Sequence, residues 1–325
     1  MTSSAASMPF IKNLASSDRK IRTAALDSLK GFLTAKYAAS TNVPLTFHDA
    51  QKLWAGLFYA LWMADRAPAQ QRLCDELAGL PKAVKLPDAA VAAWLRAFWA
   101  TMAREWTTGI DVLRMEKFML LVRRVLGAQI AWMAGEETKE KQQTTADKKT
   151  SNKSKTSSKT AADSAARTLG LEILAQWPLN VDGEAEVEPA PSASGEGDEG
   201  DEEVSERPRK KSRKAVPTMH IPVGLTMHVV DIWVDEAEKQ GLLATSESSE
   251  EQSVVDTSSL AYAMNELVVK LAAKTTAPAV RQRSREALTD DRLPWNRSAA
   301  EGQADGDGDD DKGDKANGDW DGFTD

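Results

Sequence analysis

The chain has 325 residues, a single cysteine and a net charge of −8, and 42% of its residues are hydrophobic. A lone cysteine excludes an intrachain disulfide and suits a reducing compartment. No apolar run is long enough to cross a bilayer, and the small, polar N-terminus lacks the features of a secretory signal, so we expect neither a membrane protein nor a secreted one.

The net charge conceals strong segregation along the chain. Residues 8–135 carry 17 Lys or Arg and 10 Asp or Glu, an excess of seven positive charges. Residues 182–206 contain 11 acids and no base, and residues 301–325 contain 10 acids and two lysines. A basic folded part with acidic segments is typical of proteins that bind nucleic acid or basic partners, although solubility alone explains acidic segments equally well.

Residues 8–135 are predicted to form consecutive amphipathic helices, because apolar side chains recur three or four positions apart. Ser17 is the predicted N-cap of a first long helix, and Thr46 opens the next one in a capping-box pattern with Asp49. The apolar stripe of the first helix is expected to comprise Ile21, Ala25, Leu29 and Leu33.

Further along, Pro87 precedes the start of a helix that ends at Thr108, and Asp111 is the predicted cap of a long helix reaching about Met133. Tryptophan is unusually abundant, with 10 in the chain against three Tyr and seven Phe. We therefore expect a large aromatic core in the first half, which holds Trp54, Trp62, Trp94, Trp99, Trp106 and Trp132.

Strand signals are nearly absent, so the predicted fold is all-α: an antiparallel helical array, either a bundle or a HEAT-like α-solenoid with diverged repeats. Composition divides the chain into helical and unstructured parts. The predicted parts are an N-terminal helical array at 8–135, a disordered basic insertion at 136–160, a helix packing back on the array at 161–179, a disordered acidic and basic linker at 180–216, a C-terminal helical segment at 217–292 and a disordered acidic tail at 293–325.

No catalytic, cofactor-binding or metal-binding residue is predicted. The glycine pattern at 195–200 matches a dinucleotide-binding motif only in letters, because no strand precedes it and acids surround it. The three histidines lack zinc-ligand spacing, and no group of acids suggests a magnesium site. Cys74 lies beside a leucine stripe, where an ordinary buried thiol explains it.

A dense basic run lies within the predicted linker at 207–214. We interpret it as a nuclear import signal rather than a phosphate-binding patch, because acids flank it and no folded surface carries it. Its basic residues are Arg207, Arg209, Lys210, Lys211, Arg213 and Lys214.

Basic side chains on two predicted helices are candidate contacts for RNA phosphates or an acidic partner. Arg114, Lys117 and Arg124 project within about 80° of one another at 100° per residue. A solvated face is the usual outcome for such an arc. The full candidate set is Arg96, Arg104, Arg114, Lys117, Arg123 and Arg124.

Several blocks in the chain resemble a known family. The most specific are Lys52-Leu-Trp-Ala-Gly-Leu-Phe-Tyr59 and Leu95-Arg-Ala-Phe-Trp99, followed by Gly109-Ile-Asp-Val-Leu-Arg114, Arg123-Arg-Val-Leu126 and Ile221-Pro-Val-Gly-Leu225. In this order they resemble the eukaryotic ribosomal-RNA-processing protein one family, also called the nucleolar protein fifty-two type.

This resemblance implies a non-catalytic helical assembly factor in the nucleus and nucleolus that joins precursors of the large ribosomal subunit and is required for pre-rRNA processing. It also implies co-assembling partners, including a β-propeller protein and a Brix-domain protein. Two alternatives remain from the residues: a helical adaptor outside ribosome assembly, and an rRNA-cleaving enzyme, for which we find no acid cluster.

Overall fold

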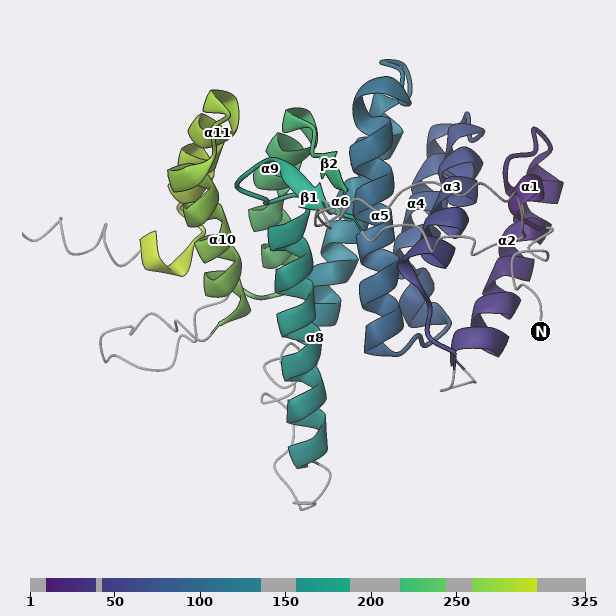
Figure 1. Ribbon diagram of the computed structural model, residues 1–325, viewed down its shortest axis with the longest axis horizontal. Helices are drawn as coiled ribbons and strands as arrows, with labels where there is room; N and C mark the ends of the chain where they lie inside the picture. The colour runs from purple at the N-terminus through teal and green to yellow at the C-terminus, as the bar shows by residue number, and fades with distance from the viewer. Residues whose placement is uncertain (1–9, 39–42, 136–155, 188–216, 244–258, 297–325) are drawn as a thin grey trace, which may run out of the picture.

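The computed structural model describes residues 10–38, 43–135, 156–187, 217–243 and 259–296. Its helices stand side by side and follow one another along the longest axis, from α1 and α2 at one end to α10 and α11 at the other (Figure 1). This arrangement confirms the predicted all-α helical array, and a HEAT-like solenoid stays a prediction. Within these residues no helix is both long and apolar enough to span a bilayer.

The described residues of the first half form six α-helices and one π-helical turn. Their bounds are α1 (Phe10–Leu14), α2 (Arg19–Leu33), η2 (Thr34–Ala38), α3 (Phe47–Trp62), α4 (Ala67–Ala83), α5 (Asp88–Thr108) and α6 (Met115–Ala134). The hydroxyl of Thr46 accepts a hydrogen bond from the Asp49 backbone N–H at 3.1 Å, as predicted for the N-cap of α3.

Two predicted helix starts were wrong. The N-cap of α2 is Asp18, whose carboxylate accepts from the Lys20 N–H at 2.7 Å, and Ile21 is exposed because it lies in the first turn at the edge of the array. Asp111 does not cap α6 directly. Its carboxylate accepts from the Arg114 N–H at 3.0 Å and closes the turn that precedes the helix.

The second half adds helices and a small ribbon that the sequence did not predict. The bounds are α8 (Thr156–Gln176), β1 (Glu184–Glu186), β2 (Thr218–His220), α9 (Val223–Lys239), α10 (Leu260–Lys274) and α11 (Pro278–Leu288). β1 and β2 pair antiparallel with Ala185 opposite Met219. Strands of three residues are too short to show the alternation by which a strand is recognised in sequence.

The predicted unstructured parts fall mostly outside the described residues, at 136–155, 188–216 and 297–325. However, α8 begins at Thr156, inside the stretch predicted as the basic insertion, which ended at 160.

The tryptophans of the first half form the expected aromatic core. Trp54, Trp94 and Trp99 are completely buried, and the Trp54 indole N–H donates to the carbonyl oxygen of Trp94 at 3.0 Å. This bond satisfies a polar group that would otherwise be costly to bury between α3 and α5.

α6 connects the two halves, since α4 of the first half and α8 and α9 of the second half all pack against it. The buried side chain of Gln129 joins three helices: its oxygen accepts from the Trp99 indole at 3.0 Å, and its amide donates to the Gly170 carbonyl at 3.0 Å. Both polar atoms of this buried amide thus have hydrogen-bond partners, and the two bonds fix the positions of α5, α6 and α8 relative to one another.

Candidate functional site

The six predicted contact residues do not form one exposed strip. Lys117 departs furthest from the prediction, because it is 6% exposed and its ammonium donates to the carbonyls of Trp62 and Ala64 at 2.7 and 2.9 Å. It therefore satisfies orphan carbonyls at the end of α3. Burial, with help from the positive charge of Arg114, lowers the pKa of Lys117. Lys117 is not a surface contact.

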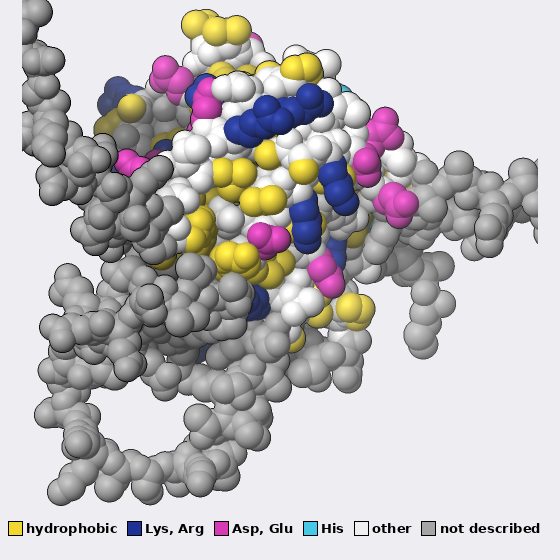
Figure 2. All heavy atoms as spheres, turned by 90° about the vertical axis from the view of Figure 1, so that its left-hand side faces the viewer, with side chains coloured by type: hydrophobic (Ala, Val, Ile, Leu, Met, Phe, Trp, Pro, Cys, Tyr) yellow, Lys and Arg dark blue, Asp and Glu magenta, His cyan; other side chains and the backbone are white. Residues whose placement is uncertain are grey.

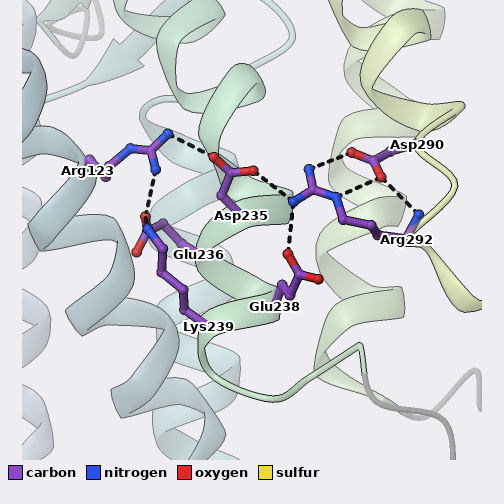
Figure 3. Close-up of polar contacts among 7 residues, drawn as sticks. All are labelled: Arg123, Asp235, Glu236, Glu238, Lys239, Asp290 and Arg292. Carbon is purple, nitrogen blue, oxygen red and sulfur yellow. Dashed lines mark hydrogen bonds and ion pairs between the residues drawn. The ribbon is translucent and has the colours of Figure 1, made fainter.

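Arg123 is also engaged within the fold. Its guanidinium donates to Asp235 at 2.9 Å and to Glu236 at 3.3 Å, both on α9 (Figure 3). On the other side of α9, Arg292 binds Asp235 at 3.0 Å and Asp290 at 2.7 Å. Asp235 thus lies between two arginines and connects α6 to the segment that follows α11.

The remaining four candidates each contact another residue of the chain. Arg124 pairs with Asp75 of α4 at 2.9 Å, and the Arg114 guanidinium lies 4.5 Å from the centre of the Trp62 ring. Arg96 donates to Gln176 of α8 at 3.4 Å, and Arg104 donates to the neighbouring Glu105 at 2.8 Å. Arg104 is the most exposed of the six, and whether it or the others bind a partner stays a prediction.

The predicted import signal at 207–214 lies outside the described residues. Cys74 is buried, and its burial raises the pKa of the thiol to about 12. In the described parts of the chain, no three His, Cys, Asp or Glu side chains gather in a way that could hold a metal ion.

A basic groove that the sequence did not reveal lies between α2, the end of α3 and the start of α4. It has a volume of about 520 Å³ and a floor of small or apolar side chains that includes Leu26, Ala60 and Leu73. Four arginines line it: Arg19, Arg22, Arg66 and Arg72. The sequence shows only that Arg19 and Arg22 lie within one turn of the same helix. No local pattern predicts that Arg66 and Arg72, at the start of α4, lie beside them.

Two adjacent apolar side chains project from the connection between α5 and α6. Val112 is 88% exposed and Leu113 is 92% exposed, which is unusual for neighbouring aliphatic residues in a folded protein. They belong to the same connection as Arg114, which covers Trp62. This apolar tip suits contact with another protein.

The α10–α11 end of the array carries a mixed surface. Figure 2 shows hydrophobic side chains in the middle of this face, with Lys and Arg side chains around them and a few acids. Val269 on α10 is among the exposed large hydrophobic residues, and Trp295 packs edge-on against Tyr262 with ring centres 5.5 Å apart. Together, the groove, the apolar tip and this end surface are three features by which the chain could bind partners.

Comparison with known proteins agrees with the blocks noted in the sequence. A family model described as nucleolar protein, Nop52, matches residues 5–176 and 199–321. Ribosomal RNA processing protein 1 homolog B from Homo sapiens is 37% identical over 121 residues, which are 37% of this chain and 16% of the human protein.

Two further relatives are similar over comparable lengths. Ribosomal RNA processing protein 1 homolog A from Mus musculus is 37% identical over 119 residues, which cover 37% of this chain and 24% of the mouse protein. The Drosophila melanogaster ribosomal RNA processing protein 1 homolog is 33% identical over 116 residues, or 36% of this chain and 16% of that protein. The matched part of this chain therefore spans less than a quarter of each relative's length.

Proposed function

Because this chain belongs to the Nop52 family of nucleolar proteins, we propose that it acts in the nucleolus as a ribosome-assembly factor required for processing of ribosomal RNA. The names of its relatives, all ribosomal RNA processing proteins, support the process. The finer proposal is a non-catalytic scaffold on precursors of the large subunit, which holds partner proteins such as a β-propeller protein and a Brix-domain protein.

The observation that carries the scaffold proposal is the contrast between a rigid interior and binding features outside it. Buried indoles and the hydrogen bonds of Gln129 fix the helices relative to one another, while Val112 and Leu113 form an exposed apolar tip. A scaffold needs both properties, because a preorganised surface lowers the entropy lost when partners bind.

Depletion of the protein tests this function. We expect unprocessed precursors of the large-subunit rRNA to accumulate, and re-expression of the chain to restore processing. A full-length form with Val112→Ser and Leu113→Ser should fold normally, since both side chains are exposed, but should restore processing poorly. Normal processing after depletion would contradict the proposal.

Identifying the proteins and RNA that copurify with the tagged full chain distinguishes the scaffold from the alternative, an adaptor outside ribosome assembly. Copurification of large-subunit precursor rRNA with assembly factors supports the scaffold, whereas transport receptors or phosphatase subunits alone would favour the adaptor. Specific cleavage of precursor RNA by the pure protein with Mg²⁺ would overturn the non-catalytic proposal.

A further inference from the structure

The arginines of the groove differ from most others in the described chain. Arg96, Arg104, Arg123 and Arg124 each bond to a side chain of the protein. By contrast, within the described residues, the side chains of Arg19, Arg66 and Arg72 form no hydrogen bond or ion pair, and all three are exposed. Three unpaired guanidinium groups converge on one hollow.

The fourth arginine and the acids of the groove leave this positive charge in place. Arg22 donates to the backbone carbonyls of Ser16 and Ser17 at 2.8 Å each, so its guanidinium is held fixed without losing charge. Glu76, one of two acids that line the groove, pairs with Lys30. The lining therefore holds four arginines against two acids, Asp65 and Glu76, and carries an excess of positive charge that would attract an anion.

The groove also has an apolar side. Leu26, Ala60 and Leu73 line its floor, and Met63, which follows the last residue of α3, lies among them. Tyr59 is 48% exposed and lies one turn before Met63, which lines the groove. Guanidinium groups suit phosphate, and an exposed aromatic ring beside a basic track suits a stacked base.

We propose that this groove binds a single-stranded segment of RNA, with backbone phosphates on Arg19, Arg66 and Arg72 and a base or sugar over the apolar floor beside Tyr59. A peptide of acidic residues alone would satisfy the arginines but would leave the apolar floor and the aromatic ring unused, so the combination of the three favours RNA. The volume of about 520 Å³ falls within the range of roughly 300–1,000 Å³ typical of pockets for small-molecule ligands, so it could hold a base or sugar. The identity of the RNA as precursor rRNA rests on the proposed function, whereas the groove itself does not.

The test measures binding of the full chain to a fluorescent 12-nucleotide single-stranded RNA of mixed sequence over a range of salt concentrations. The triple variant Arg19→Gln, Arg66→Gln and Arg72→Gln removes side chains without partners in the described structure, so the fold should be kept. We expect at least a tenfold weaker affinity. The slope of log K against log salt should shrink by about 2, because each lost phosphate contact removes roughly 0.7.

The matched control removes three positive charges elsewhere, with Lys82→Gln, Lys270→Gln and Arg285→Gln, all at exposed positions. The RNA affinity of this control should stay within about twofold of that of the unchanged chain. That change is smaller than the loss expected from removing one phosphate contact. Equal losses in both triple variants would overturn the groove as a site, because general charge would then explain binding. Unchanged affinity in the groove variant would overturn it too.

Substitutions of Tyr59 test the stacking part of the proposal separately from the phosphate contacts. Tyr59→Leu should weaken RNA binding about fivefold or more, while Tyr59→Phe should retain it, since stacking contributes about 1–3 kcal/mol per base. If Tyr59→Leu binds RNA normally, the stacking part of the proposal is wrong. A synthetic peptide of residues 301–325 that binds the groove while RNA does not would assign the site to an acidic segment instead.

The failure of this site and that of the proposed function are distinguishable. If the groove variant loses RNA affinity yet depletion of the protein leaves rRNA processing normal, the site stands and the proposed function falls. If depletion blocks processing while the groove variant binds RNA as tightly as the unchanged chain, the function stands and the site falls.

Discussion

Arg123 and Asp235 lie 112 residues apart in sequence, and their side chains meet at 2.9 Å between α6 and α9. The same guanidinium reaches Glu236, whose side chain is only 5% exposed. Burial alone would raise the pKa of Asp235. Hydrogen bonds from Arg292 and Arg123 outweigh this effect and lower the pKa below its ordinary value. This connection joins the N-terminal array to the C-terminal helices.

Loss of Arg123 should therefore destabilise the fold. We expect Arg123→Met to lower the free energy of unfolding by about 2 kcal/mol, because the nearly buried Glu236 would lose one of its cationic partners. Arg283→Met is the matched control, since Arg283 pairs with Asp231 where both side chains are more than 40% exposed. The control should change stability by less than about 1 kcal/mol in urea denaturation, and equal effects would contradict this account.

Gly170 lies where α8 packs against α6. A Cβ atom at this position would overlap the side chain of Met133 and lie 3.4 Å from the Trp132 ring. Gly170→Ala should destabilise the protein by about 1–3 kcal/mol, because the helices must separate. Gly79→Ala in α4 meets nothing within 4 Å and should stabilise by about 0.5–1 kcal/mol through helix propensity. Thermal unfolding of both variants checks the difference in sign.

His228 makes stability depend on pH near neutrality. Its Nε2 lies 3.0 Å from the Met119 carbonyl, and burial lowers its pKa, against the opposing effect of that hydrogen bond. Below the ordinary value of about 6.5 the unfolded chain binds a proton that the folded state resists, so stability is full above this pH and falls as pH decreases.

Urea midpoints of the unchanged chain and of His228→Gln, taken at several pH values from 5 to 8, isolate this contribution. The difference in stability between the two proteins should narrow as the pH falls below 6.5. A difference that is constant with pH would show that His228 titrates alike in the folded and unfolded chain.

Cys74 should resist thiol reagents in the folded protein. With a pKa of about 12, the fraction of thiolate at pH 8 is roughly a thousandfold below that of an ordinary cysteine, and the side chain is fully buried. Labelling with Ellman's reagent should be very slow in buffer and complete in guanidinium chloride. Rapid labelling of the native chain would show that α4 opens readily.

The basic run at 207–214 should direct nuclear import. Arg209→Gln, Lys210→Gln and Lys211→Gln in a fluorescently tagged full chain should shift it toward the cytoplasm. Residues 148–159 contain a second, less dense group of lysines. The same change at Lys148, Lys149 and Lys153 serves as the control and should leave the protein nuclear. Equal redistribution by both sets would contradict a specific signal, since charge alone would then act.

Local sequence patterns were sufficient to predict most of the helices. Apolar side chains at a spacing near 3.6 predict helices wherever the pattern is long, and the Thr46 cap depends only on residues within one turn. The aromatic core and the family resemblance followed equally from local patterns. The β1–β2 ribbon was missed because its strands are too short to leave a pattern.

Which charged side chains are available for binding depends on the tertiary structure. Lys117 was predicted in an arc with Arg114 and Arg124, and Arg123 was among the other candidate contacts, yet the end of α3 and the acids of α9 bind their charges. Arg19 and Arg72, on helices with no obvious relation in sequence, meet at one groove. The physical reason is that helical period fixes the direction of a side chain about its own axis, whereas exposure depends on neighbours contributed by distant parts of the chain.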